Sequence, residues 1–485
     1  MTSNLKQKTI HGLFWSFIDN FSKLGLQFIF GIILARILSP REFGLIGMLT
    51  IFIAVSQAIV ESGFSTALIR KKDCSEADYS TVFYFNLIVS VLLYIVLYFS
   101  SGLIGQFFGE PELDEMLKVF GLVLIINALG MIQQTIFSKE INFKTQTYVT
   151  LIASVGSGVL AITAALMGMG VWSLVILNLS RAFLNTLFLW IWSVWRPILI
   201  FSKKSFYELF GFGSKLLISA LIETIFQNIY YVVIGKYFSA QELGFYTRAD
   251  QFRNLPSKNI MSVVQRVSFP VLSAIQDEPE RLMENYKKLI RSSMYITFIM
   301  MLGMAAIAKP TVLTLIGEKW LPSVPYLQLL CFVGMFYPLQ ALNLNMLNVK
   351  GRSDLFLRLE IIKKLIAIPV IVIGILLGIK AMIIGMIANS AIAYALNSSY
   401  SGKLIGYSTK QQILDILPAF LFSSFMAGIV YLFSIMVSLD NFLLLLLQLL
   451  IGAILVFVSG EIFKMKDYIY LKYILLEQWQ KFKES

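Results

Sequence analysis

The residues of this sequence best able to do chemistry are charged side chains that interrupt long apolar runs. Asp19 and Lys23 are four residues apart, so on a helix they share one face and can form an ion pair. Arg181 stands in the middle of another apolar run, between Asn178 and Asn185. A charge among apolar residues is costly, so such positions are candidates for a binding site or an ion pathway.

A second set of polar residues lies after residue 220. Glu223 and Gln227 are again four residues apart. The next segment carries the charged residues Arg248, Asp250, Arg253, Lys258 and Arg266. Guanidinium groups suit phosphate because their planar fork donates paired hydrogen bonds. We interpret the whole set as the lining of a water-filled cationic cavity for an anionic head group. The alternative is structural: ion pairs that fix helix packing, and lysines that reach toward an interface.

No motif for catalysis accompanies these charges. The segment GFGSK at residues 211–215 does not have the spacing of a nucleotide-binding P-loop. His11 is the single histidine, and Cys74 and Cys331 lie far apart in the sequence, which argues against a metal cluster. We therefore expect no enzyme, no cofactor and no metal.

The composition indicates that these charges belong to a membrane protein. Of the 485 residues, 57% are hydrophobic and 14% are charged, and the mean hydropathy is +0.76, whereas soluble domains carry about 25% charged residues. The net charge of +12 is spread over many short loops. A nucleic-acid-binding surface would gather it into one stripe. We expect membrane lipids, and no nucleic acid, as partners.

Apolar runs between clusters of charge predict about 14 transmembrane helices. They fall near residues 13–38, 43–66, 80–104, 116–137, 147–167, 171–195, 209–236, 243–272, 290–309, 326–348, 358–378, 382–404, 413–434 and 441–462.

The loops indicate how these spans are oriented. If the N-terminus is cytoplasmic and the spans alternate, most basic loop residues fall on the cytoplasmic side, and the outer loop GEPELDE at residues 109–115 is acidic. Both termini are therefore predicted to be cytoplasmic. Residues 464–485 mix lysines with apolar and aromatic residues, which predicts an amphipathic helix on the inner leaflet. A disordered basic tail is the alternative.

A repeat with an offset of 200 residues relates two parts of the chain. Gln27, Ser39, Glu42 and Gly44 correspond to Gln227, Ser239, Glu242 and Gly244. Six predicted spans separate the copies, so both enter the membrane in the same direction, as in transporters built from parallel repeats. We predict an all-α membrane protein with an N-terminal six-helix lobe at residues 1–200 and a parallel C-terminal lobe at residues 201–404. The substrate site should lie between the lobes, two further spans occupy residues 405–463, and the tail covers residues 464–485.

The repeated segments SPREFG and SAQELG read as helix starts. Ser39 is a predicted N-cap, Pro40 suits the first helical position, and Glu42 completes a capping box. The second copy keeps the serine and the glutamate at residues 239 and 242. We therefore interpret Arg41 and Glu42 mainly as structural residues.

The chain resembles a known transporter family. The resemblance rests on FGIILARILSPREFGLIGMLTIF at residues 30–52, FFGEPEL at 107–113, GMGVWSLV at 168–175 and RADQFRNLPSKNI at 248–260. These segments are similar to the polysaccharide-transporter family, in its Wzx-like branch near the colanic-acid and teichuronic-acid exporters. That family belongs to the multidrug/oligosaccharidyl-lipid/polysaccharide flippase (MATE/MOP) superfamily. The resemblance covers about residues 10–400.

This resemblance implies a two-lobed flippase that works by alternating access. Its substrate would be an undecaprenyl-pyrophosphate-linked oligosaccharide, carried across the bacterial inner membrane for exopolysaccharide, capsule or O-antigen synthesis. The expected substrate-binding residues of the cavity are Lys23, Gln27, Arg181, Gln227, Arg248, Arg253 and Arg266. The expected residues for coupling to a proton or sodium ion are Asp19, Glu223 and Asp250.

Two other functions are alternatives to the flippase. A drug or cation antiporter of the related extrusion family should have a mainly acidic cavity, whereas the segment near residues 243–272 is mainly basic. A membrane polymerase or ligase of lipid-linked sugars should have a large outer loop with Arg or His chemistry, and the outer loops here are short.

A polysaccharide polymerase and a chain-length regulator are the expected protein partners.

Overall fold

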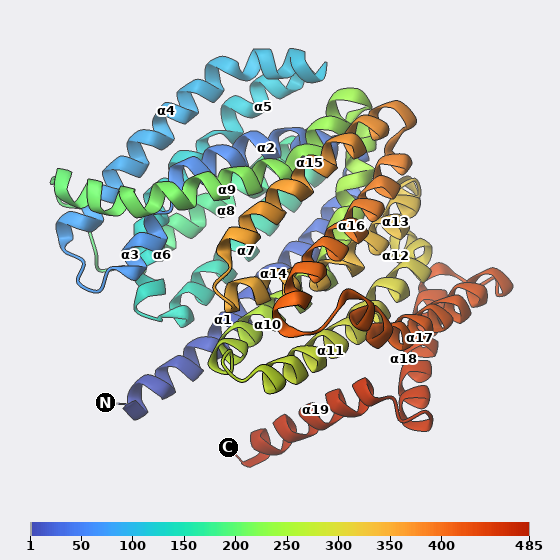
Figure 1. The fold of residues 1–485 in the computed structure, drawn as a ribbon. Helices are drawn as coiled ribbons and strands as arrows, with labels where there is room; N and C mark the ends of the chain where they lie inside the picture. Colours follow the sequence, from blue (N-terminus) through green and yellow to red (C-terminus); the bar gives the residue numbers. More distant parts are fainter. Residues whose placement is uncertain (1, 485) are drawn as a thin grey trace. The chain divides into compact units, whose positions relative to one another are not determined.

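The described part of the chain consists of helices joined by short loops. The computed structural model describes the backbone of residues 2–484, and the side chains of these residues except 2–14, 16–17, 258–267, 353, 474–475 and 478–484. Within residues 2–484 no β-strand occurs (Figure 1). The prediction of an all-α fold is confirmed. The helices form two compact units, Met1–Gly244 and Phe245–Ser485.

The first unit contains nine helices within the described residues, coloured from blue to green in Figure 1. They are α1 (Thr2–Ile37), α2 (Pro40–Glu61), α3 (Phe64–Arg70), α4 (Glu76–Phe108), α5 (Glu112–Phe120), α6 (Leu122–Lys139), α7 (Phe143–Leu166), α8 (Trp172–Trp192) and α9 (Lys203–Tyr237). The first residues of α10 (Ala240–Ala274) also belong to this unit. Helices α1, α6 and α8 pack on α7, and α2, α3 and α4 pack on α9.

The second unit begins within α10 and runs to the C-terminus. Its further helices are α11 (Pro279–Ala306), α12 (Ala308–Leu315), the 3₁₀ turn Glu318–Trp320, α13 (Ser323–Met335), α14 (Tyr337–Val349), α15 (Ser353–Leu377), α16 (Ile379–Ile405), α17 (Thr409–Met436), α18 (Asn441–Ile462) and α19 (Lys466–Glu484). Helix α11 packs against α13, α14, α17 and α19. It therefore forms the centre of this unit.

Each predicted span coincides with a helix or with two consecutive helices. Among the described residues, twelve helices are long and apolar enough to cross a membrane. The predicted spans that do not meet this criterion are α10 and α15. Both carry several charged residues, including Arg248 and Arg253 on α10 and Glu360 and Lys363 on α15.

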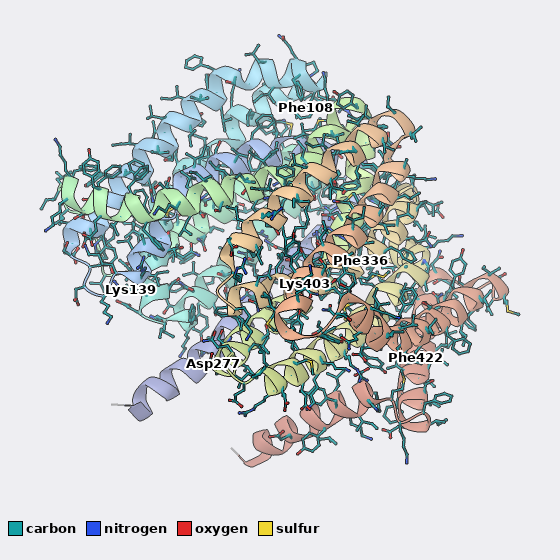
Figure 2. All side chains as sticks on the ribbon, in the orientation of Figure 1. Phe108, Lys139, Asp277, Phe336, Lys403 and Phe422 are labelled. Atoms are coloured by element: carbon teal, nitrogen blue, oxygen red, sulfur yellow. The ribbon has the colours of Figure 1, made fainter. Side chains whose placement is uncertain are left out.

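The outer surface carries many large apolar side chains, as expected for helices in contact with lipid. Phe99 is 79% exposed, Leu166 is 72% exposed and Leu376 is 76% exposed. Figure 2 shows such side chains projecting from the helices. A soluble protein would bury most of this surface, whereas a bilayer solvates it.

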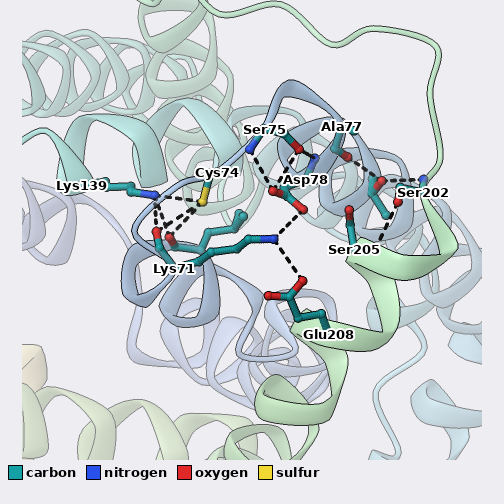
Figure 3. A network of polar contacts seen from close by, with 11 residues as sticks. Lys71, Cys74, Ser75, Ala77, Asp78, Lys139, Ser202, Ser205 and Glu208 are labelled. Atoms are coloured by element: carbon teal, nitrogen blue, oxygen red, sulfur yellow. Dashed lines mark hydrogen bonds and ion pairs between the residues drawn. The ribbon is translucent and has the colours of Figure 1, made fainter.

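Helix α9 is held to the first unit by a polar network around the loop that follows α3 (Figure 3). The Lys71 ammonium lies 3.1 Å from a carboxylate oxygen of Asp78 on α4 and 3.1 Å from one of Glu208 on α9. Burial opposes the charge of Lys71, but the hydrogen bonds to both carboxylates outweigh that effect and raise the pKa of Lys71. The Ser202 backbone N–H also donates to the Thr81 hydroxyl at 2.9 Å. By packing, the first compact unit ends at residue 244. The lobe boundary at residue 200 stays a prediction.

The two repeated segments start helices as the sequence predicted. The Ser39 backbone N–H donates to the Glu42 carboxylate at 2.5 Å, which is the reciprocal half of a capping box. In the second copy, the Glu242 backbone N–H donates to the Ser239 hydroxyl at 3.1 Å. The Arg41 guanidinium pairs with Glu110 and Glu112 at 2.5 and 3.1 Å and so ties α2 to the loop before α5 and to the first residue of α5. These contacts give Arg41 and Glu42 a structural role.

The repeated segments also approach each other within the first unit. A Cβ at Gly44 would lie 1.6 Å from the carbonyl oxygen of Ala240, and a Cβ at Gly244 would lie 1.9 Å from that of Pro40. Gly44 and Gly244 are equivalent in the repeat, as are Pro40 and Ala240. The contact is therefore self-complementary, like an interface on a two-fold axis.

Candidate functional site

A polar cavity of about 310 Å³ opens inside the first unit. Its wall is built from α1, α6, α7 and α8, with single contributions from α2 and α5. It is lined by Asp19, Lys23, Ile53, Phe120, Val123, Asn127, Gln134, Gln146, Thr150, Ala153, Ser154, Asn178, Arg181, Ala182 and Asn185. Most of these side chains are polar, although the helices that carry them are apolar enough to span a bilayer.

Three of the residues singled out from the sequence meet in this cavity. Asp19 and Lys23 come from α1 and Arg181 comes from α8. Lys23 is close enough to Asp19 to interact with its charge, and Thr150 is within hydrogen-bonding reach of the same carboxylate. Residues about 160 positions apart in sequence thus form one charged site.

Two of these charged groups carry polar atoms without a partner. Asp19 Oδ1 and Arg181 Nε are buried and have no hydrogen bond to any described residue. An unsatisfied buried polar atom costs about 1–3 kcal/mol. Polar atoms left in this state beside a cavity are suited to bind a ligand, an ion or water.

Amide side chains supply most of the remaining polar lining. Asn178 and Asn185 lie three and four residues from Arg181, on the same face of α8, and both line the cavity. The cavity also contains polar residues that were not among the predicted site residues: Asn127 and Gln134 on α6 and Gln146 and Thr150 on α7. Their spacing in the sequence could have identified them. Asn127 and Gln134 are seven residues apart and Gln146 and Thr150 are four apart, so each pair lies on one face of its helix.

The amides also hold the wall of the cavity together. The Gln146 side-chain amide donates to the Gln134 carbonyl oxygen at 3.0 Å and to the Ser138 hydroxyl at 2.8 Å, which joins α7 to α6. The Asn127 amide donates to Gln57 on α2 at 3.3 Å. Amides both donate and accept hydrogen bonds, so this wall matches the hydroxyl groups of a sugar as well as phosphate oxygens.

A second charged cluster lies on α10 in the second unit. Arg248 and Asp250 are 7% and 8% exposed. The Arg253 guanidinium donates to Asp250 at 2.5 Å, and the Asn254 amide donates to the other oxygen of that carboxylate at 2.8 Å. The Arg248 guanidinium donates to Gln251 at 2.5 Å. Asp250 is therefore already neutralised by Arg253, unlike Asp19.

Arg248 also lies against an aromatic ring. Its guanidinium carbon lies 5.8 Å from the centre of the Trp320 ring, which is buried. A cation over an indole ring is stabilised by the ring quadrupole. Helix α10 and the Glu318–Trp320 turn thus form a basic cluster in the second unit.

The remaining predicted residues lie elsewhere. Gln27 is half-buried on α1 and does not line the polar cavity of the first unit. Glu223 and Gln227 are exposed on α9, where the Gln227 amide donates to Glu223 at 2.8 Å. The side chain of Arg266 lies outside the described residues. The structure thus brings Asp19, Lys23 and Arg181 together and leaves Glu223 with Gln227 in a separate exposed pair.

Apolar grooves accompany the polar cavity. One of about 740 Å³ in the first unit lies between α2, α4 and α9 and is lined by residues such as Phe52, Leu97 and Phe107. A groove of this composition can accommodate a hydrocarbon chain and has no group to hold a charge.

The sequence of this chain is similar to those of known polysaccharide biosynthesis proteins. A family model described as "Polysaccharide biosynthesis protein" matches residues 33–325, more than half of the chain. The lipopolysaccharide biosynthesis protein WzxC of Escherichia coli (strain K12) is 26% identical over 86% of each chain. The teichuronic acid biosynthesis protein TuaB of Bacillus subtilis (strain 168) is 27% identical over 73% of each chain. The succinoglycan biosynthesis transport protein ExoT of Rhizobium meliloti (strain 1021) is 27% identical over 68% of this chain and 67% of its own.

Solved structures share the fold. The lipid II flippase MurJ in an inward closed conformation superposes with a TM-score of 0.75 at 18% identity, covering 93% of this chain and 98% of its own. An inward-facing multidrug resistance MATE family transporter of the MOP superfamily gives a TM-score of 0.62 at 17% identity, covering 79% and 94%. At such identities the likeness establishes the helical fold alone.

Proposed function

Because the chain belongs to the polysaccharide biosynthesis protein family, we propose that it is a flippase for lipid-linked oligosaccharides, the repeat units of a polysaccharide. The substrate carries a charged pyrophosphate, a polar sugar chain and an apolar lipid. The flippase moves the polar part through the membrane while the lipid stays in hydrocarbon. No covalent bond changes in this process, so we propose that the chain is a transporter and not an enzyme.

The observation that carries this proposal is the polar cavity of the first unit. Among the described residues that line it, the cations Lys23 and Arg181 outnumber the one carboxylate, Asp19, and the remaining polar lining is rich in amides. Cations match the pyrophosphate, and amides match the sugar hydroxyls. The apolar grooves outside the cavity are suited to the lipid chain.

Translocation then requires that the cavity open to one side of the membrane and later to the other. Charges in the cavity replace the water around the phosphates, which lowers the cost of moving them through the apolar layer. Arg248 and Arg253 on α10 remain proposed phosphate-binding residues, within the charged cluster of the second unit. Asp19 is the preferred coupling residue, because its carboxylate lines the cavity and retains an unpartnered oxygen.

The test is transport by the purified chain in liposomes. The probe is a fluorescent undecaprenyl-pyrophosphate oligosaccharide, and an impermeant reductant quenches the label only on the outer leaflet. We expect Lys23→Gln with Arg181→Gln to slow flipping by roughly tenfold or more, since each charged hydrogen bond contributes about 1.5–3 kcal/mol. The matched control is Lys204→Gln with Lys215→Gln, which removes the same charge from exposed positions on α9 outside the cavity. Equal rates in both double variants would contradict the proposal.

A drug or cation antiporter is the competing function. It would require a cavity that attracts cations, whereas the cavity of the first unit holds more cationic than anionic side chains. Export of a cationic dye by the reconstituted chain, without flipping of the fluorescent lipid-linked sugar, would favour the antiporter.

We also propose the bacterial inner membrane as the location, with both termini in the cytoplasm. The distribution of lysine and arginine over the loops supports this orientation. A flippase in that position delivers repeat units to the outer face. A polysaccharide polymerase and a chain-length regulator are therefore the proposed partners.

A further inference from the structure

A basic pocket of about 290 Å³ lies between α11 and α19 in the second unit. Figure 1 shows α19 running beside α11 after the chain turns back at the end of α18. The pocket is lined by Glu284, Lys287, Lys288, Arg291, Lys466, Asp467 and Tyr470. It is separate from the cavity proposed for transport, and no role in flipping has been assigned to these residues.

The turn that forms this pocket is fixed by several contacts. Lys464 adopts a left-handed backbone conformation with φ of 45°. The Tyr468 hydroxyl donates to Glu461 at 3.0 Å, and its ring fits so closely on Gly460 that a Cβ there would lie 2.5 Å from it. Arg291 on α11 pairs with Asp467 on α19 at 3.1 Å. The first turn of α19 is therefore held firmly against α11.

The pocket keeps cationic charge that the protein does not neutralise. Arg291 is paired with Asp467, and Lys287 is paired with Asp415 at 3.0 Å. Lys288 and Lys466 line the pocket and make no ion pair with any described residue. Glu284 is the carboxylate that remains beside these two lysines. The surplus of positive charge is suited to an anion.

Apolar surface flanks the pocket on both sides. Ile469, Tyr473 and Leu476 on α19 are 46%, 66% and 52% exposed, and their spacing places them on one helix face. On the other side, Tyr468 lines an apolar groove of about 480 Å³ formed with α11, α17 and α18. An anion that binds between two apolar surfaces should itself be amphiphilic.

We propose that this pocket binds the phosphate headgroup of an anionic phospholipid. The ammonium groups of Lys288 and Lys466 and the hydroxyl of Tyr470 face the phosphate, and the acyl chains lie along the apolar surfaces beside it. Basic pockets at the membrane surface recognise anionic lipid headgroups in this way, and an amphipathic helix such as α19 places its apolar face among the acyl chains. The bound lipid stabilises α19 in its position on α11. This site is independent of the proposed flippase function.

The experiment measures lipid binding to the full chain in a neutral detergent. Phosphatidylglycerol, phosphatidylcholine and inorganic phosphate are titrated separately, and native mass spectrometry and thermal unfolding report binding. We expect phosphatidylglycerol to bind at one site and to raise Tm, and phosphatidylcholine to do neither. Each lysine near an anionic surface contributes about fivefold in affinity, so Lys288→Ala with Lys466→Ala should weaken binding about 30-fold.

The matched control is Lys403→Ala with Lys410→Ala, which removes two exposed lysines of the same unit that do not line the pocket; Lys403 is labelled in Figure 2. This control should bind phosphatidylglycerol like the unaltered chain. Replacing Lys288 and Lys466 by Arg should also preserve binding, which shows that the charge and not the fold was lost. Unchanged phosphatidylglycerol binding in the Ala pair would overturn the proposal. So would inorganic phosphate that gives the same stabilisation as the lipid, because the site would then recognise an anion alone.

Discussion

Of the carboxylates expected to couple transport to an ion, Asp19 is the one that lines the polar cavity of the first unit. Its carboxylate lines a cavity with Lys23 and Arg181 and keeps one buried oxygen without a partner. Glu223, the other carboxylate expected on the equivalent helix of the repeat, is exposed on α9 and accepts a hydrogen bond from Gln227. A coupling ion or proton changes the charge of the cavity only if it binds a group that lines it. We therefore propose Asp19, rather than Glu223, as the coupling residue.

The first prediction is that Asp19→Asn uncouples transport without preventing substrate binding. The neutral amide cannot gain or lose a proton and leaves the positive charges of Lys23 and Arg181 in place. Flipping in liposomes should therefore lose its acceleration by an imposed proton or sodium gradient, while the affinity for lipid-linked pyrophosphate stays equal or increases. Glu223→Gln is the matched control and should respond to the gradient like the unaltered chain. A gradient response that survives in Asp19→Asn and disappears in Glu223→Gln would reverse the assignment.

At the scale of elements, the close contact between the two repeated helix starts depends on the absence of side chains. A Cβ at Gly44 or Gly244 would overlap a backbone carbonyl oxygen of the other segment. Backbone atoms cannot turn aside as a flexible side chain does, so the two helices would have to separate. Such overpacking typically costs about 1–3 kcal/mol.

We accordingly predict that Gly44→Ala and Gly244→Ala each lower Tm and slow transport. Gly211→Ala is the control, because a Cβ at that position meets no atom within 4 Å. Alanine favours a helix over glycine by about 1 kcal/mol, so this control should keep or raise Tm, as measured by thermal unfolding in detergent. If Gly44→Ala were as stable as Gly211→Ala, the close contact would not exist in the folded protein.

At the scale of the whole molecule, the loops determine how the chain lies in the membrane. The basic tail after residue 463 and the acidic loop at residues 109–115 are predicted to face opposite sides. The tail forms a helix, α19, which carries an exposed apolar face. Its fold matches an amphipathic helix at a membrane surface better than a disordered basic tail.

The corresponding prediction concerns reporter fusions in a bacterial cell. A fluorescent protein fused after Ser485 should be bright, because it folds in the cytoplasm, and alkaline phosphatase at that point should be inactive. Phosphatase inserted after Gly109, in the loop between α4 and α5, should be active because that loop is predicted to face outward. Phosphatase activity at the C-terminus would instead require an odd number of spans or the opposite orientation.

Local patterns in the sequence were enough to predict the positions of the helices and several of their polar residues. Apolar runs set the positions of the helices, and Ser39 with Glu42 set the start of α2, because helix formation and capping depend on residues only a few positions apart. The spacing of Asn178, Arg181 and Asn185 also corresponds to one face of α8, where the structure shows all three lining the cavity. The same reasoning found Asp19 and Lys23 as neighbours on α1.

Which of these helix faces meet became visible in the three-dimensional packing. It joined α1 with α8 around one cavity, added Gln134 and Gln146 to the wall, and left Glu223 on the exposed face of α9. It also explained one of the two glycines of residues 211–215: a Cβ at Gly213 would lie 2.5 Å from the Ser62 carbonyl oxygen, so this residue serves close packing of α9. Helical periodicity specifies the polar face of each helix, but the partner of that face depends on packing between segments far apart in the chain, which no local pattern encodes.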